Sequence, residues 1–211
     1  MIFSVLAGHI SLQAGVTLVS NSANSQSEED TFFSGYSLFQ SFHTGSESAT
    51  IDGIQLQFGY LGNASGIGVS VYSDFGGQVG NLLSSFTPMG PPGMMMYQTF
   101  GFAGSLNVNA NSNYWIVLSA TGGTDLYGNS MPSSWNYAAL TSSGAEVGLA
   151  GWTLANSHYQ GSASSPTEYS GNPIKVSITG SVPEPSTASL LLLGIGGWFS
   201  FNRRRRSLNV V

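Results

Sequence analysis

Residues 49–60 read ATIDGIQLQFGY, and this stretch decides the fold class. From residue 54 onward, apolar side chains alternate with glutamines in the order Ile54, Gln55, Leu56, Gln57 and Phe58. Successive side chains of a β-strand point to opposite faces, so a period of two predicts a strand with one buried face. We therefore expect a strand over 49–60.

The same signal recurs on both sides of this stretch. Ile67–Tyr72 and Ile174–Ile178 alternate, and Tyr114–Leu118 is a dense run of β-formers that predicts a buried central strand. Shorter strands are expected at residues 15–20, 36–43, 82–86, 97–103, 135–140 and 151–154. Loops are expected at residues 21–34, 87–93, 122–134 and 161–173. No stretch before Ser186 shows helical periodicity, so we predict an all-β domain of the β-sandwich or jelly-roll kind.

Composition narrows the class of protein. Only 7% of the 211 residues are charged, and there is no cysteine, so disulfide bonds cannot stabilise the fold. Before Pro183 the chain carries one basic residue, Lys175, against nine acidic residues. Nucleic-acid binding rests on Lys and Arg neutralising phosphates, so nucleic acid is not an expected partner. Neutral glycans and divalent cations remain possible binding partners.

Three different signals follow one another near the C-terminus. Pro183-Glu184-Pro185 is a rigid, extended turn, because proline fixes φ and removes the amide donor. Residues 187–201, TASLLLLGIGGWFSF, carry no charge and no proline. Four arginines follow at 203–206, and a basic cluster of this kind favours the cytoplasmic side of a membrane. We expect residues 186–201 to form a single transmembrane helix, with a buried core helix as the alternative. Its anchoring residues would be Leu190, Leu191, Leu192, Leu193, Ile195, Trp198 and Phe199.

This arrangement resembles the PEP-CTERM sorting signal, which consists of Pro-Glu-Pro, a short membrane segment and an arginine-rich tail. The matching residues are Pro183, Glu184 and Pro185, then 186–201, then Arg203, Arg204, Arg205 and Arg206. The resemblance implies processing by an exosortase and a place first at the inner membrane, then at the cell surface or in the matrix of a Gram-negative bacterium. The setting of that family is the extracellular polysaccharide of biofilms.

The domain before the tail gives further expectations. Residues 15–180 are similar, more loosely, to the "choice-of-anchor" surface domains, on stretches such as 15–21, 71–77 and 113–118. That resemblance implies no known enzymatic activity. Residues 1–14 are expected to be a truncated signal peptide cleaved near Ala14, or alternatively to include a first strand at 5–10. The sorting signal is expected over 181–206.

The sequence contains no clear catalytic motif. The three histidines are scattered, no G-x-S-x-G occurs, and nine acids select no particular pair, so we expect a protein that is not an enzyme. A secreted hydrolase is the least favoured alternative. Calcium could bind oxygen-rich loops at Asp74 with Asn81, or at Asp125 with Asn129, although Asp74 is better explained as the cap of a turn in 73–80.

Aromatic side chains suggest one kind of binding. Tryptophan and tyrosine can stack on sugar rings, and the candidates are Trp135 with Tyr137 and Trp152 with Tyr159. Packing within the domain is the alternative for all four, and Trp115 is expected in the core. The sequence thus predicts an exported structural or adhesive surface protein, with a carbohydrate-binding module for matrix polysaccharide as the alternative.

Overall fold

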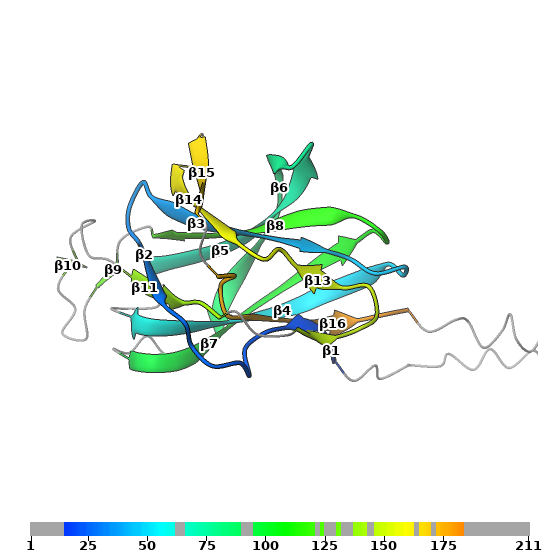
Figure 1. Cartoon of the computed structure of the whole chain (residues 1–211), viewed down its shortest axis with the longest axis horizontal. Coiled ribbons are helices and arrows are strands. Elements are labelled where there is room, and N and C mark those ends of the chain that lie inside the picture. Colours follow the sequence, from blue (N-terminus) through cyan, green and yellow to red (C-terminus); the bar gives the residue numbers. More distant parts are fainter. Residues whose placement is uncertain are drawn as a thin grey trace, which may run out of the picture. The chain divides into compact units, whose positions relative to one another are not determined.

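The computed structural model describes residues 15–61, 66–89, 95–120, 123–124, 130–131, 137–142, 146–162, 165–169 and 172–183. All regular secondary structure in these ranges is β-strand, which confirms the predicted all-β class (Figure 1). The larger strands are β1 (Val16–Ser20), β2 (Glu29–Phe32), β3 (Ser37–His43), β4 (Ala49–Leu61), β5 (Ile67–Phe75), β6 (Gln78–Met89), β7 (Met95–Val108), β8 (Asn113–Ala120), β11 (Tyr137–Leu140), β14 (His158–Ser162), β15 (Ser165–Tyr169) and β16 (Val176–Ser181). Two-residue strands are β9 (Gly123–Thr124), β10 (Ser130–Met131), β12 (Val147–Gly148) and β13 (Thr153–Leu154).

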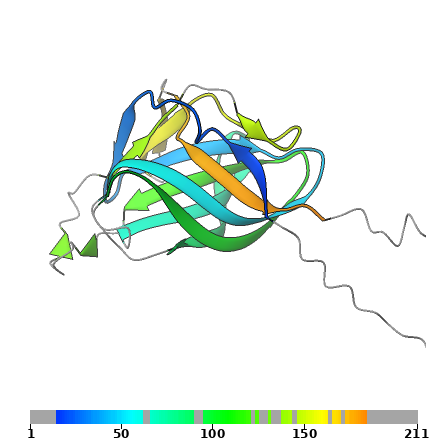
Figure 2. The same ribbon diagram turned by 90° about the horizontal axis from the view of Figure 1, so that it is seen from below.

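Fourteen of the strands form one curled antiparallel sheet, and β9 pairs with β10 in a separate two-stranded sheet. The order of the larger sheet is β12-β1-β16-β4-β7-β6-β5-β8-β3-β14-β15, with β11, β2 and β13 attached to the side of this path. Strand β6 makes the curl, because it pairs with β5 up to Phe86 and with β7 from Thr87 onward. The two halves consequently lie over one another in Figures 1 and 2, with β1, β16, β4 and β7 in one layer and β5, β8 and β3 in the other.

The core fills the space between these layers. The alternating residues Ile54, Leu56 and Phe58 of β4 are at most 1% exposed, as the period of two predicts. From the opposite layer, Ile116 and Leu118 of β8 are fully buried. The stretch that predicted the fold class therefore supplies the centre of one layer.

Strand β16 occupies an interior position in the sheet. It pairs with β1 on one side and with β4 on the other, both antiparallel. Two buried side-chain amides fix the start of this strand, because Asn21 accepts from the backbone N–H of Val176 and Gln40 accepts from that of Ile174, two residues before the strand. The last strand of the domain is thus held by partners along its whole length.

All four predicted loops contain some strand. Residues 21–34 include β2, residues 161–173 include β15, residues 122–134 include the two-residue strands β9 and β10, and Thr87–Met89 belong to β6. These strands carry few β-branched or aromatic residues, and pairing with a neighbour gives them their conformation instead. Their backbone N–H and C=O groups would otherwise need another partner.

The predicted membrane helix at 186–201 lies outside the described residues, as do residues 1–14. Within the ranges that the structure describes, no helix has the length and apolarity needed to cross a membrane. The chain divides into two compact units, Met1–Ser181 and Val182–Val211.

Candidate functional site

The outer face of the β5–β8–β3 layer carries an aromatic cluster. Ile116 and Leu118 of β8 point into the core, so Trp115 and Val117 point to the opposite, outer side. Phe39 of β3 lies beside Val117 on that side, and these three side chains are at most 6% exposed. Tyr72, Val79 and Tyr159 pack against them and are half-buried.

Two hairpins cover this outer face. Figure 1 shows β14–β15 and the β5–β6 turn rising from the same side of the layer, on either side of β3 and β8. The first hairpin contributes Tyr159, which meets Trp115 edge-on with ring centroids 5.2 Å apart. The second contributes Tyr72 and Val79. The buried rings of the cluster are therefore enclosed by segments that are distant in sequence.

Asp74 connects the β5–β6 turn to the cluster. Its Oδ1 accepts a hydrogen bond of 2.7 Å from the indole Nε1 of Trp115, and its Oδ2 accepts one of 3.0 Å from the backbone N–H of Gly77. Gly76 and Gly77 both have positive φ, at 63° and 83°, as a two-residue hairpin turn of this type requires. The expectation that Asp74 caps a turn agrees with these bonds.

Polar groups surround the aromatic side chains. Ser70 and Ser85 share a hydrogen bond of 3.0 Å across β5 and β6, and His43 Nδ1 lies 2.8 Å from Asn113 Oδ1 at the end of β3 and β8. A tyrosine offers an apolar ring face with a polar edge. The outer face therefore combines half-buried tyrosine rings with hydroxyl and amide groups.

The structure groups the predicted aromatic residues differently from the sequence. Tyr159 packs on Trp115 and not on Trp152. Trp152 is 5% exposed and stacks on Phe42 with ring centroids 6.1 Å apart. Trp135 and the side chain of Tyr137 lie outside what the structure describes. Trp115 is buried as predicted, but it lies on the outer side of its strand.

The roles of Tyr72, Val79 and Phe39 were not foreseen from the sequence. Strand alternation marks Tyr72 as facing away from Val71, and that signal was available. The return of the β5–β6 turn onto Trp115 could not be predicted from the sequence, because it involves a long-range hydrogen bond that the indole Nε1 of Trp115 donates to Asp74 Oδ1.

The calcium site at Asp74 or Asp125 stays a prediction. The described part of the chain holds no group of three or more His, Cys, Asp or Glu side chains placed to share a metal ion. Asp125 lies outside that part. Both carboxylate oxygens of Asp74 accept hydrogen bonds within the protein.

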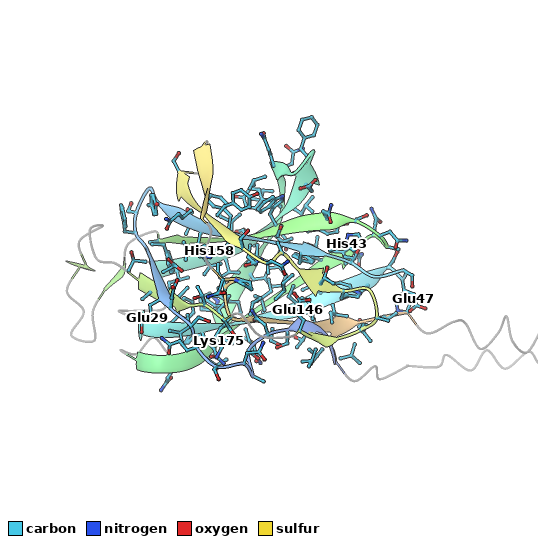
Figure 3. All side chains as sticks on the ribbon, in the orientation of Figure 1. Glu29, His43, Glu47, Glu146, His158 and Lys175 are labelled. Carbon is cyan, nitrogen blue, oxygen red and sulfur yellow. The ribbon has the colours of Figure 1, made fainter. Side chains whose placement is uncertain are left out.

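A second set of titratable groups lies inside the domain. His158 of β14 (Figure 3) is fully buried, and its Nε2 lies 3.5 Å from Oδ2 of Asp30, which is 8% exposed. His158 Nδ1 lies 2.8 Å from the carbonyl oxygen of Asn172, so Nδ1 carries the hydrogen. Burial raises the pKa of Asp30, the charge of His158 opposes that rise, and Glu28 adds to it.

Glu146 and Lys175 also have displaced pKa values. Burial raises the pKa of Glu146, while the hydrogen bond of 2.9 Å that its Oε1 accepts from the backbone N–H of Leu154 opposes the rise. Burial lowers the pKa of Lys175, whose Nζ donates to the carbonyl oxygen of Asn24. Figure 3 shows both residues on the domain. Each serves a backbone group and so fits a structural role.

Strand pairing ends where the β-domain ends, at Ser181. Ser181 is the last residue of β16 and pairs with Thr50, whereas the next two residues, Val182 and Pro183, belong to no strand. Pro183 is exposed. The family model for the PEP-CTERM protein-sorting motif matches residues 181–206, beginning at this junction. This chain carries a PEP-CTERM sorting motif.

The sorting motif implies membrane-associated sorting, processing by an exosortase, and export to the cell surface or the extracellular space of a Gram-negative bacterium. Among curated proteins, none matches this chain. Apart from Pro183, the residues predicted to carry the motif, the membrane anchor and the arginine cluster lie outside the described residues.

Proposed function

We propose that this chain is a structural or adhesive protein of the cell surface or extracellular matrix, delivered by its PEP-CTERM motif, and that its β-domain acts without catalysis. The motif directs the sorting of the chain, and the β-domain is the part that is exported. Inner-membrane anchoring through residues 186–201 and a place in biofilm polysaccharide are parts of this proposal.

The observation that carries the proposal is the match at residues 181–206, which starts where the last strand ends. A sorting tail attached to the end of a complete domain can be removed without taking any of the domain's paired strands. The composition is consistent with an exterior location, since only 7% of the residues are charged, which is low for a cytosolic protein.

Fractionation of a host that carries an exosortase tests this proposal. The native chain should reach the outside of the cell and lack the arginine tail, as shown by intact mass. Replacing Pro183, Glu184 and Pro185 with alanine should retain the full-length chain at the inner membrane. Deleting residues 207–211, which follow the matched region, is the control and should leave delivery unchanged. Cytosolic protein with its tail intact would refute the proposal.

A second candidate function is the binding of neutral matrix polysaccharide. The supporting observation is the outer-face cluster, in which Tyr72 and Tyr159 present half-buried rings beside Trp115. Acidic glycans are disfavoured, because the single basic side chain before the motif, Lys175, is only 6% exposed.

Affinity electrophoresis in gels of neutral polysaccharide tests the second candidate. Tyr72→Ala and Tyr159→Ala should each weaken binding by about tenfold, which corresponds to about 1.4 kcal/mol and to the loss of one aromatic contact. Tyr36→Ala is a matched control, because Tyr36 is also half-buried but stacks on Phe33 outside the cluster. If the native chain and the three variants bind equally, the outer-face cluster does not bind polysaccharide.

A further inference from the structure

Part of strand β6 has a neighbouring strand on one side only. It pairs with β5 over most of its length but with β7 only over its last three residues. Nearer the turn, the Oγ of Ser84 donates to the carbonyl oxygen of Ser105 in β7. Over residues 78–83, no other described strand pairs with β6 on the side away from β5. These residues form a free edge on the hairpin that projects from its layer in Figure 1.

Two β-bulges explain why β6 leaves β7. The register between β5 and β6 shifts twice, once on each side of Tyr72. At the first shift, Leu83 of β6 has no residue opposite it in β5. An extra residue bends its strand and increases the local twist. The twist carries residues 78–83 away from β7 and leaves one side of them without a strand partner among the described residues.

Exposed apolar side chains gather on this part of the molecule. Leu82 is 55% exposed and Leu83 is 42% exposed, and Phe75 at the tip of the same hairpin is 79% exposed. Exposed apolar residues along a free edge promote pairing with another strand. The edge therefore offers both backbone hydrogen-bonding groups and apolar area to an extended segment.

Other edges of the sheet carry features that prevent such pairing. β12, at one end, has two residues, and β15, at the other end, contains Pro166 and Glu168. β2, attached at the side, contains Glu29 and Asp30. Short edges, proline and charged residues all hinder the addition of a strand. Residues 78–83 read QVGNLL and contain neither proline nor a charged residue.

The distribution of charge favours a second copy of the chain as the partner. Before Pro183 the chain carries nine acidic residues against one basic residue, so two copies repel one another over most of their surfaces. Between Asp74 and Asp125, however, the sequence contains no acidic or basic residue and no histidine. This uncharged interval includes the whole of β6, β7 and β8. A charged partner gains nothing at such an edge, whereas an identical edge meets no repulsion there.

We propose that two copies of this chain pair through residues 78–83 of β6, antiparallel and about a two-fold axis near Leu82 and Leu83. An interface of this symmetry uses the same edge in both copies, so assembly stops at the dimer. The β5–β8–β3 layer then continues through β6 into the second copy, with both outer-face clusters on the same side. This pairing adds a partner to the proposed structural role and does not depend on how the chain is sorted.

Cysteine cross-linking of the full-length chain tests this pairing, because the native sequence contains no cysteine. Leu82→Cys, Leu83→Cys and Gln78→Cys are purified reduced, in detergent, and then oxidised. A disulfide needs two Cα atoms within about 7 Å of one another. Residues near the axis meet this condition, whereas Gln78, four positions from Leu82, would lie about 26 Å from its copy along the paired strands. We expect a cross-linked dimer from Leu82→Cys or Leu83→Cys, and cross-linking slower by at least about tenfold from Gln78→Cys.

Val147→Cys is the matched control for collisions between copies. Val147 is another exposed apolar residue, at 60%, and it lies on the short edge strand β12. Cross-linking of Gln78→Cys or Val147→Cys as fast as that of the leucine positions would overturn the proposal. The absence of a cross-linked dimer from both leucine positions would also overturn it.

A charge on the edge provides a second measurement without cysteine. Leu83→Lys brings like charges close together across the axis, which destabilises a pair of strands. In sedimentation equilibrium of the full-length chain in detergent, we expect the dissociation constant of the dimer to rise by at least about tenfold. Val147→Lys should leave it unchanged, and both variants should keep the circular dichroism spectrum of the native chain. Equal dimerisation of the two lysine variants would show that β6 is not the interface.

Discussion

At the scale of single residues, Asp30 and His158 place a carboxyl group and an imidazole side by side inside the domain. The desolvated carboxyl has a raised pKa, so the folded state holds its proton more tightly than the unfolded chain does. The stability from this difference is fully present below the unfolded pKa of about 4 and is lost as pH rises through the folded pKa.

Asp30→Asn should remove this dependence. An amide cannot ionise, and its N–H can donate to Nε2 of His158, whose Nδ1 already donates to Asn172. We expect the variant to gain stability relative to the native chain as pH rises above about 4. Urea unfolding at several pH values from 4 to 8 measures the difference. Glu47→Gln is the control, since Glu47 is exposed (Figure 3), and a parallel response from it would contradict the assignment.

Gln40 illustrates a buried side chain that replaces backbone pairing. It is 1% exposed, accepts from the N–H of Ile174 at 3.0 Å and donates to the carbonyl oxygen of Ala155 at 3.1 Å. It thereby joins β3 to the approaches of β14 and β16.

Gln40→Leu should lower the free energy of unfolding by on the order of 2–4 kcal/mol, because the buried N–H of Ile174 and the part-buried carbonyl oxygen of Ala155 lose their partner. Urea unfolding gives the value directly. Gln26→Leu serves as the comparison, since Gln26 is exposed and makes an exposed hydrogen bond to Glu29. If Gln40→Leu lowers the free energy of unfolding no more than Gln26→Leu does, the hydrogen bonds of Gln40 contribute little to stability.

At the scale of elements, the β5–β6 hairpin shows how a turn can organise a surface. Gly76 and Gly77 set the turn, and Asp74 ties it to Trp115. The tip presents Phe75, which is 79% exposed. The turn thus positions the Tyr72 and Val79 side of the outer-face cluster.

Gly77→Val should destabilise the domain by about 1–2 kcal/mol, because left-handed backbone is unfavourable for residues with a Cβ. No atom lies within 4 Å of a Cβ built at Gly77, so the cost is conformational and not a clash. Gly77→Asn should retain most of the stability, since asparagine tolerates this conformation. Thermal melting of the three chains checks the order, and equal melting of the valine and asparagine variants would contradict it.

Strands with clear alternation could be predicted from the sequence, and the others could not. The sequence predicts β4, β5 and β16, because apolar residues such as Ile54, Val69 and Ile178 alternate with other residues in them and are buried. β2 and β15 do not, because EDTF and SPTEY become strands only by pairing with β11 and β14. The outer-face cluster was hidden for a similar reason. Tyr159 of β14 reaches Trp115 through a long-range pairing that local sequence does not encode.

At the scale of the whole molecule, the folded β-domain and the sorting motif occupy successive parts of the chain. The buried side chains of the described residues lie at or before Ile178, and the motif begins at residue 181. Charge follows the same division, with four arginines in the motif and nine acids before it.

A chain that stops after Pro183 should therefore keep the melting temperature of the β-domain while losing its attachment to membranes. Sedimentation of cell membranes measures the attachment, and circular dichroism measures the melting temperature. A lower melting temperature would show that residues 184–211 stabilise the domain. The full-length chain with Leu190–Leu193 replaced by serine is the companion variant, and it should lose attachment to the same extent.

The interior place of β16 also sets an order of events in time. Its neighbours β1 and β4 come from the first third of the domain, yet the gap between them can be filled only by the final segment. A polypeptide that emerges N-terminus first, from a ribosome or through a translocation pore, must keep that gap open until almost everything has passed. Insertion of β16 between β1 and β4 is then the last step in forming this layer during synthesis or export, and the sorting motif is the next segment to emerge.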